Sequence, residues 1–201
     1  LYLDIDSTVL EDTLLRVTPL FLRDKNIGFV QLHTIPTNAK GESSLSLVQC
    51  LRNYFLRLET GFYTHTSHSL FYGHNAIWRT DVVREIGSCL EYHNEEVVVT
   101  EDLSMSLRAS FKGYYGVGAW LHSGEWVPES MKETEAMWLR WTVGTYQVYA
   151  KHFTKIENLK KLSRQEIMGW LQHVGVLINY GLLPVYVACG LVFNSKLLMS
   201  I

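Results

Sequence analysis

The chain has few cysteines and no sign of a cysteine pair. Its three cysteines, Cys50, Cys89 and Cys189, are widely spaced and form no CxxC motif, which argues against both a disulfide framework and a zinc site. An excess of charge of one sign is also lacking, because 18 Lys and Arg face 20 Asp and Glu. Nucleic acid is therefore not an expected partner. No internal repeat, low-complexity tract or signal peptide is visible, and a reducing, cytosolic setting fits best.

Charge is missing altogether near the C-terminus. Residues 167–193, IMGWLQHVGVLINYGLLPVYVACGLVF, contain no Asp, Glu, Lys or Arg. The run exceeds the roughly 20 residues that a helix needs to cross a bilayer core, so it predicts a transmembrane helix at 166–195; a buried core helix is the alternative. Only Lys196 follows the run, whereas several basic residues precede it: Lys151, Lys155, Lys160, Lys161 and Arg164. This bias predicts that the preceding domain lies on the cytoplasmic side.

Residues 1–128 alternate short apolar runs with helical patterns, which is typical of an α/β fold. Strands are expected at 1–5, 27–33 and 69–73, and as two separate strands within 114–127. Helices are expected at 9–23, 44–61, 80–86 and 101–112. After residue 129, a long aromatic-rich helical pattern ends in lysines, which predicts an amphipathic helix. This helix can lie in a membrane interface, pack on the domain, or do both with different faces.

The opening segment LYLDIDSTVL places two aspartates, Asp4 and Asp6, at the end of an apolar run. Carboxylates beyond the end of a strand suit Mg²⁺ or Mn²⁺ bound to a diphosphate. An aspartyl-phosphate phosphohydrolase uses the same spacing, with Asp4 as nucleophile and Thr8 on the phosphate. That chemistry also needs a second acidic pair after a late strand, which is missing here. A sugar-nucleotide metal site is the better of the two interpretations, although a solvated strand end explains the pair without a metal.

A second acidic group follows a β-branched run in VVVTEDLSMSLRASFKGY. Thr100, Glu101 and Asp102 stand where a helix begins, and a helix N-terminus favours an ionised carboxylate. Asp102 at the rim of a pocket can accept the proton of a sugar hydroxyl as a general base. Capping of the helix explains the same residues without catalysis. The motif taken alone leaves both interpretations open.

Five motifs, taken in order, resemble those of the family-2 processive glycosyltransferases, which include cellulose, chitin, hyaluronan and bacterial glucan synthases. They are LDID, IGFVQLHTIPTN, FYGHNAIWRTDVVREIG, VVVTEDLSMSLRASFKGYYGVGAWLHSGEWVPES and MWLRW. The resemblance covers essentially the whole chain. It implies a Rossmann-like GT-A fold, the nucleotide-diphospho-sugar transferase fold. The implied parts are the C-terminal half of the GT-A domain (1–128), an amphipathic interface helix with a basic linker (129–165), a transmembrane helix (166–195) and the start of the next loop or span (196–201).

The resemblance implies a role for each residue that matches a family motif. Asp4 and Asp6 would bind Mg²⁺ or Mn²⁺ and, with Arg140, the donor diphosphate. Asp102 would be the catalytic base. The residues implied in acceptor binding are Gln31, Gly73, His74, Asn75, Glu101 and Trp141. The implied reaction is the metal-dependent, inverting transfer of a hexose, expected to be glucose, from a UDP-sugar to a growing polysaccharide.

The resemblance also implies a cellular setting. A protein of this family is expected in the inner (plasma) membrane, with several spans in the lipid bilayer and the catalytic domain on the cytoplasmic side. The family's domain begins with a uracil-binding half that precedes the Asp-x-Asp motif, whereas this chain begins at Leu1 just before it. We therefore expect the chain to be part of a longer enzyme and to be inactive alone.

Two positions depart from the family pattern. His74 stands where cellulose synthases carry a small hydroxyl residue, a variant similar to bacterial glucan synthases. Met137 replaces the Gln that opens the Gln-x-x-Arg-Trp motif, and a thioether cannot donate a hydrogen bond. Transfer of one sugar to a lipid or short acceptor is therefore an alternative to processive synthesis. A further alternative is an inactive or truncated relative that acts as an interaction subunit.

Overall fold

The structure is a computed structural model that describes residues 1–39, 46, 49–51, 54, 61 and 69–173. Its main sheet has four strands in the order β1-β6-β2-β3. The strands are β1 (Thr8–Val9), β2 (Ile27–Pro36), β3 (Ala76–Trp78) and β6 (Tyr115–Glu125). β2 and β6 pair in parallel, while β1 with β6 and β2 with β3 pair antiparallel. This mixed sheet confirms the expected α/β class and is consistent with a GT-A domain.

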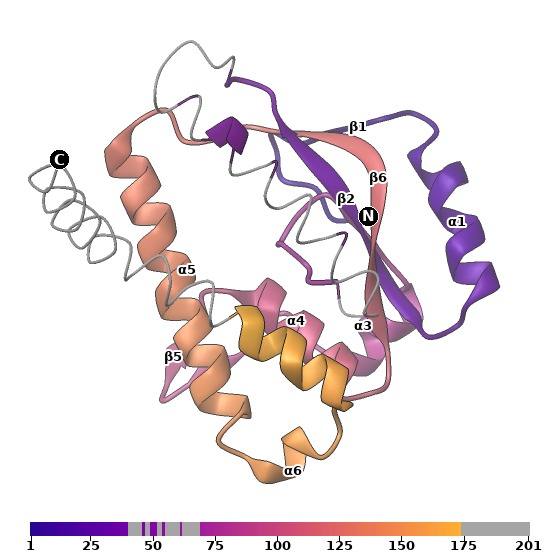
Figure 1. Cartoon of the computed structure of the whole chain (residues 1–201), viewed down its shortest axis with the longest axis vertical. Coiled ribbons are helices and arrows are strands. Elements are labelled where there is room, and N and C mark those ends of the chain that lie inside the picture. The colour runs from indigo at the N-terminus through magenta and orange to yellow at the C-terminus, as the bar shows by residue number, and fades with distance from the viewer. Residues whose placement is uncertain (40–45, 47–48, 52–53, 55–60, 62–68, 174–201) are drawn as a thin grey trace, which may run out of the picture.

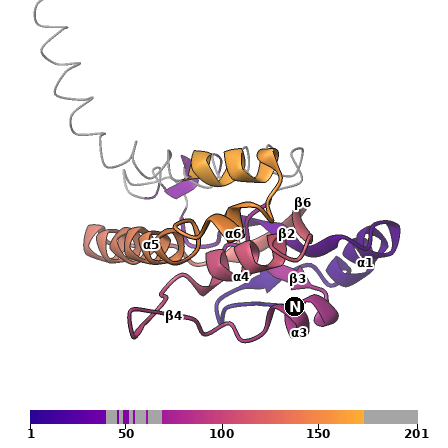
Figure 2. The same ribbon diagram turned by 90° about the horizontal axis from the view of Figure 1, so that it is seen from below.

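Helices flank the sheet. They are α1 (Thr13–Arg23), α3 (Thr80–Ile86), α4 (Glu101–Ser110), α5 (Met131–His152) and α6 (Ile156–Leu159), and residues 164–173 are also helical. A small hairpin of β4 (Tyr92–His93) and β5 (Glu96–Val97) stands apart from the main sheet. In both views α1 and α5 lie on opposite sides of the sheet, with α4 between them (Figures 1 and 2).

The core follows the alternation of side chains along β2, which sends successive residues to opposite faces of the sheet. Phe29 packs with Trp78, Phe71 and residues of α3 and α4 on one face. Val30 and the other residues of the opposite face pack against α1, which contributes the fully buried Val17. A third cluster joins α4 to α5 and to helix 164–173 through Leu70, Val98, Leu103, Leu107, Val148, Leu162 and Trp170.

Most of the expected helices are confirmed. The expected helix at 9–23 forms over Thr13–Arg23, and α3 and α4 begin close to the expected residues. α3 ends at Gly87, whose φ of +83° suits glycine. The long helical pattern after residue 129 forms α5, which begins with a capping box between Ser130 and Glu133. Its place in a membrane interface stays a prediction.

Four expected strands are wrong in extent. Residues 1–5 form a single antiparallel bridge, from Tyr2 to Ala76, and the chain then turns at Ile5 and Asp6. The expected strand at 69–73 is likewise one bridge, from Ser69 to Gly116. The two strands expected within 114–127 are instead one continuous strand, β6, because it pairs with β2 along almost its whole length.

Two further expectations lie largely or partly outside the described residues. The expected helix at 44–61 falls mostly on undescribed positions. The predicted membrane span at 166–195 is described only as far as residue 173. In that first part Trp170 is fully buried and packs with Tyr149 and Phe153 of the α5 end. Within the described residues, no helix is long and apolar enough to cross a membrane.

Candidate functional site

Asp102 lies in the first turn of α4, at the second residue of the helix. Thr100 occupies the N-cap position, yet its side chain makes no capping hydrogen bond; Asp102 instead accepts a hydrogen bond from the Leu103 N–H of the first turn. Burial raises the pKa of the Asp102 carboxyl to about 7, and Glu101 adds to the rise. The Leu103 N–H, 2.8 Å from Oδ1, and the charge of Arg140 oppose it. A carboxyl with this pKa is suited to accept a proton near neutral pH.

The loop that precedes β3 brings Gly73 beside Asp102. A Cβ added at Gly73 would stand 3.4 Å from Asp102 Oδ2. Gly73 has a φ of +90° and Asn75 a φ of +51°, so the loop turns through two left-handed positions that most side chains disfavour. The expected acceptor loop and the expected base therefore meet in space.

Gln31 holds this loop from the middle of β2. Its side chain is fully buried, and its Nε2 donates to the carbonyls of His74 (3.0 Å) and Asn75 (3.1 Å). Its Oε1 accepts a hydrogen bond from the Tyr72 N–H at 3.1 Å. The structure thus uses Gln31 to fix the loop. Direct contact of Gln31 with an acceptor stays a prediction.

Two polar residues of the loop, His74 and Asn75, contact the end of β6. The buried Asn75 donates from Nδ2 to the Gly124 carbonyl at 3.2 Å. His74 Nε2 lies 3.7 Å from Glu125 Oε1, and both side chains are mostly buried. These contacts join the loop to β6, in addition to the hydrogen bonds that Gln31 of β2 makes to it. Binding of an acceptor by His74 or Asn75 stays a prediction.

α5 carries two further expected site residues, Arg140 and Trp141. Arg140 is exposed, and Trp141 is partly buried. Since the charge of Arg140, in the middle of α5, lowers the pKa of Asp102, these two expected site residues belong to one candidate site. Glu101, the first residue of α4, is exposed at the same helix start. The stacking of Trp141 on a sugar stays a prediction.

Asp4 and Asp6 project from a tight turn between the Tyr2 bridge and β1. The Ser7 N–H donates to the Asp4 carbonyl at 3.0 Å, and the Asp4 N–H to Ser7 Oγ at 3.2 Å. Both aspartates are exposed. Tyr2 pairs with Ala76, two residues after His74, so this turn leaves the sheet beside the loop of Gly73.

The donor set at Asp4 and Asp6 fits a substrate-borne metal. Among the described residues, no three His, Cys, Asp or Glu side chains come together as a metal-binding group. Two exposed carboxylates are what Mg²⁺ commonly takes from a protein when substrate phosphates supply other oxygens. Asp4 and Asp6 therefore suit Mg²⁺ or Mn²⁺ that arrives with a diphosphate, and do not make a closed protein site.

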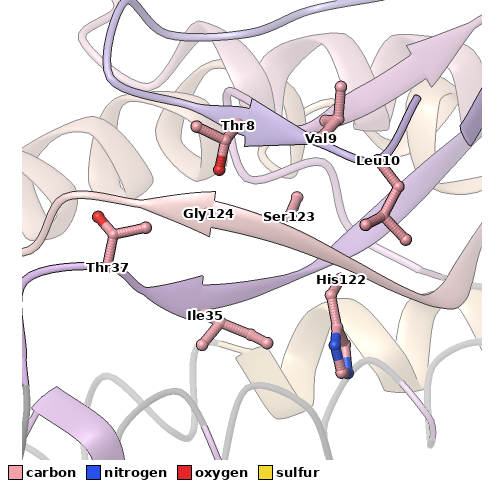
Figure 3. A pocket seen from close by; sticks show the side chains of 8 residues that line it. All are labelled: Thr8, Val9, Leu10, Ile35, Thr37, His122, Ser123 and Gly124. Atoms are coloured by element: carbon pink, nitrogen blue, oxygen red, sulfur yellow. The ribbon is translucent and has the colours of Figure 1, made fainter.

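An open pocket lies where β1 pairs with the end of β6, next to the end of β2 (Figure 3). It is lined by Thr8, Val9, Leu10, Ile35, Thr37, His122, Ser123 and Gly124. None of the expected site residues lines it. The candidate site is thus defined by the meeting of Asp102, Gly73 and Arg140 rather than by this pocket.

Sequence reasoning missed the residues that hold α5 in place. Gly144 lies so close to Thr100 that an added Cβ would clash with its side chain. Gln147 binds the backbone of residues 97 and 99, and Glu91 joins Ser104, Lys151 and His152. A glycine inside a long helical pattern was the one signal available, because such a glycine usually has a packing reason.

Comparison with known proteins identifies the family of the chain. Residues 1–200 match the family described as glycosyl transferase family group 2. The chain belongs to this family. The glycosyltransferase chain is also similar to a protein of Oryza sativa subsp. japonica that is described as probable glucomannan 4-beta-mannosyltransferase 6, with 26% identity over 166 residues. That match covers 80% of this chain and 28% of the rice protein, so the chain spans little more than a quarter of its curated relative.

Proposed function

We propose that this chain forms the base-catalytic part of an inverting glycosyltransferase that transfers a hexose from a nucleotide-diphospho-sugar to a glycan acceptor. The observation that carries the proposal is the place of the Asp102 carboxyl, which lies against Gly73 of the expected acceptor loop. Burial there raises the pKa of this carboxyl to about 7, and the charge of Arg140 opposes the rise. Membership of the glycosyltransferase family supports the same conclusion.

The reaction forms one bond and breaks one bond at the anomeric carbon. The acceptor oxygen attacks this carbon from the face opposite the diphosphate, and the bond between the carbon and the diphosphate oxygen breaks. Asp102 takes the proton of the acceptor hydroxyl. Because the attack comes from the face opposite the leaving diphosphate, the product has inverted configuration. A base with a pKa near 7 combines sufficient basicity with an ionised fraction at neutral pH. Trp141 would hold the acceptor ring on its apolar face.

Positive charge for the leaving diphosphate would come from two sources. Arg140 presents a guanidinium that can meet phosphate oxygens in a fixed fork. Asp4 and Asp6 would hold Mg²⁺ or Mn²⁺, which supplies charge stabilisation for the departing diphosphate when it is bound. Together these groups favour the transition state, in which negative charge builds on the diphosphate.

The wider assignment is a membrane-bound polysaccharide synthase that uses a UDP-sugar. The GHNAI segment favours glucose as the transferred sugar, whereas the rice relative is described as a mannosyltransferase. The uncharged run at 167–193 supports an inner-membrane location with a cytoplasmic catalytic domain. Met137 favours, as second candidate, a transferase that adds a single sugar. Product length, measured with UDP-glucose and GDP-mannose in parallel, separates the two.

The decisive experiment replaces Asp102 by Asn in the full-length protein in membranes. Turnover should fall by about 10²- to 10⁴-fold, the usual contribution of a general base, while binding of the nucleotide sugar stays unchanged. Asp81→Asn is the matched control, since Asp81 is an exposed aspartate in the first turn of α3. Asp102→Asn turnover within about tenfold of wild type would disprove the base assignment. A wild-type protein with no transfer to any acceptor would instead favour an interaction subunit.

A further inference from the structure

One side of α5 meets the segment that leads into α4. Arg140, Gly144, Gln147 and Lys151 follow one another at intervals of four, three and four residues, so they share one face of the helix. Three of them contact residues between Glu91 and Thr100. The fourth, Arg140, stands one turn before the first of these contacts and acts on Asp102. Figures 1 and 2 show α5 and α4 side by side.

The contact at Gly144 is the closest approach of this face. A Cβ at residue 144 would stand 2.4 Å from Thr100 Cγ2 and 2.5 Å from Thr100 Oγ1. Glycine is otherwise a poor choice inside a long helix, because alanine has the better helix propensity. The missing side chain is therefore what allows α5 to rest on Thr100, two residues before Asp102.

Gln147 makes the second contact through both ends of its amide. Its Oε1 accepts from the Val99 N–H at 3.0 Å, and its Nε2 donates to the Val97 carbonyl at 3.2 Å. The side chain is 5% exposed. The Gln147 side chain thus makes the hydrogen bonds that a neighbouring strand would make to residues 97 and 99, which lead to Asp102. A change at Gln147 to an apolar residue would remove both of these hydrogen bonds to the backbone.

We propose that Gly144 and Gln147 are positioning residues that fix the distance between Arg140 and the Asp102 carboxylate and so control base catalysis. This inference rests on the proposed function of Asp102. Neither residue is expected to touch a substrate. Each acts by holding the α5 face against the chain that enters α4.

The charged groups around Asp102 define what should change when this contact loosens. Glu101 from α4 and Arg140 from α5 act on its carboxyl with opposite sign. On the next turn of α4, Ser104 donates to Glu91, which also binds Lys151 and His152 of α5. If α5 moves away, the effect of Arg140 weakens while that of Glu101 remains. The Asp102 carboxyl would then bind its proton more tightly.

The first test is Gln147→Leu in the full-length enzyme, with Thr142→Ala as control. Thr142 is exposed on α5, and its hydroxyl donates to the Trp138 carbonyl of the same helix. In Gln147→Leu the acid limb of kcat/KM should move to higher pH, and on that limb kcat/KM should fall by a factor of ten for each pKa unit of the shift. Thr142→Ala should keep the wild-type profile. An unmoved acid limb in Gln147→Leu would overturn the proposal.

The second test is a double-mutant cycle between Gly144 and Thr100. Gly144→Ala should lower kcat/KM and shift the acid limb in the same direction. Thr100→Ala removes the two closest atoms that the new Cβ would meet, so the double variant should recover most of the loss. If the losses of kcat/KM in the two single variants simply add in the double variant, the contact between residues 144 and 100 does not position Asp102, which would count against the proposal. If Gly144→Ala does not fold, Gln147→Leu decides alone.

Asp102→Asn separates this inference from the function on which it rests. If that variant keeps its turnover, the assignment of Asp102 as base fails. If it is inactive while Gln147→Leu and Gly144→Ala keep the wild-type pH profile, only the positioning role fails.

Discussion

The Asp102 carboxylate lies against the backbone of Gly73, whose added Cβ would be 3.4 Å from Oδ2. The contact shelters the acid from water, and the φ of +90° at residue 73 disfavours any residue with a side chain there. Burial of a charge without a full set of partners costs stability. The arrangement therefore exchanges some stability of the fold for a base that works near neutral pH.

Asp102→Asn should stabilise the protein at alkaline pH. The folded-state pKa of about 7 lies above the reference value of 3.8. As pH rises from about 4 to 7, the unfolded state ionises first, so wild-type stability falls across this window. The amide variant escapes this loss. Its gain in free energy of unfolding should be about 1–3 kcal/mol larger at pH 8 than at pH 4.

Urea unfolding of matched variants at the two pH values measures this difference. Asp81→Asn serves as the control, because the hydrogen bond from Arg79 lowers the pKa of Asp81. That variant should show no gain at pH 8. Equal effects of pH on wild type and Asp102→Asn would contradict the prediction.

The same pKa predicts the pH dependence of catalysis. A general base must be unprotonated, so kcat/KM should fall as pH drops through about 7, by a factor of ten for each further pH unit. Glycosyl transfer measured between pH 5 and pH 9 gives the profile. An acid limb near pH 4 would mean that Asp102 is an ordinary exposed carboxylate.

Glu91→Gln should destabilise the protein by about 2–3 kcal/mol, because hydrogen bonds to charged groups are the stronger ones. Burial opposes ionisation, but hydrogen bonds from His152, Lys151 and Ser104 hold the pKa of Glu91 well below its usual range. Stability from a lowered pKa is present above the unfolded value of 4.5 and is lost as pH falls below it. The gap between wild type and Glu91→Gln should thus narrow in acid.

Glu85→Gln is the matched control for Glu91. The Glu85 side chain is 43% exposed, and its oxygen lies 3.6 Å from Lys112 Nζ. A surface pair of this kind contributes about 0–1 kcal/mol. Urea unfolding at pH 7 and pH 4 compares the two, and similar losses in both would show that the Glu91 cluster is no more than a surface ion pair.

Gly116→Ala should destabilise the sheet by at least about 2 kcal/mol, because overpacking forces the backbone to move. A Cβ there would stand 2.2 Å from Phe29 Cζ and 2.6 Å from the Ser69 carbonyl oxygen. Gly113→Ala isolates the effect of conformation, since Gly113 has a φ of +83° and nothing within 4 Å of an added Cβ. That variant should lose about 1 kcal/mol. Equal midpoints of urea unfolding for both variants would argue against the clash.

Removal of metal should stop transfer, and Mg²⁺ or Mn²⁺ should restore it. Asp4→Asn and Asp6→Asn should each weaken metal-dependent binding of the nucleotide diphosphate by about tenfold or more, as loss of one of few carboxylate ligands implies. Calorimetry with and without the metal measures this. Asp12→Asn is the control, because Asp12 is an exposed acid paired with Arg16 at 2.7 Å. Unchanged binding in all three variants would exclude a metal site at Asp4 and Asp6.

Local patterns were sufficient to predict much of the fold. The helical periodicity of residues 9–23 and 131–152 indicated α1 and α5, and Gly87 marked the end of α3. The strand expected at 1–5 was wrong because its apolar residues alone cannot specify a partner, and only Tyr2 finds one. The unity of β6 was missed because residues 121–123 separate the two expected strands, and the pairing of His122 and Ser123 with β2 that joins them is a long-range contact.

The site could be predicted only in its residue types. Motif order identified Asp102 and Arg140, and the structure adds that the charge of one acts on the other. The support from Gln147 to residues 97 and 99 could not be foreseen, because it joins segments about fifty residues apart. Such pairings depend on tertiary packing, which a single sequence does not display.

The parallel pairing of β2 with β6 has a consequence for folding. Ser123 Oγ donates to the His33 carbonyl across a sequence separation of 90 residues. Closing so long a loop costs conformational entropy before the native contacts that compensate for it can form. During synthesis, β2 therefore stays unpaired on the side that faces β6 until β6 has been made. During that interval the apolar side chains of β2 are exposed, and binding by a chaperone would protect them from aggregation.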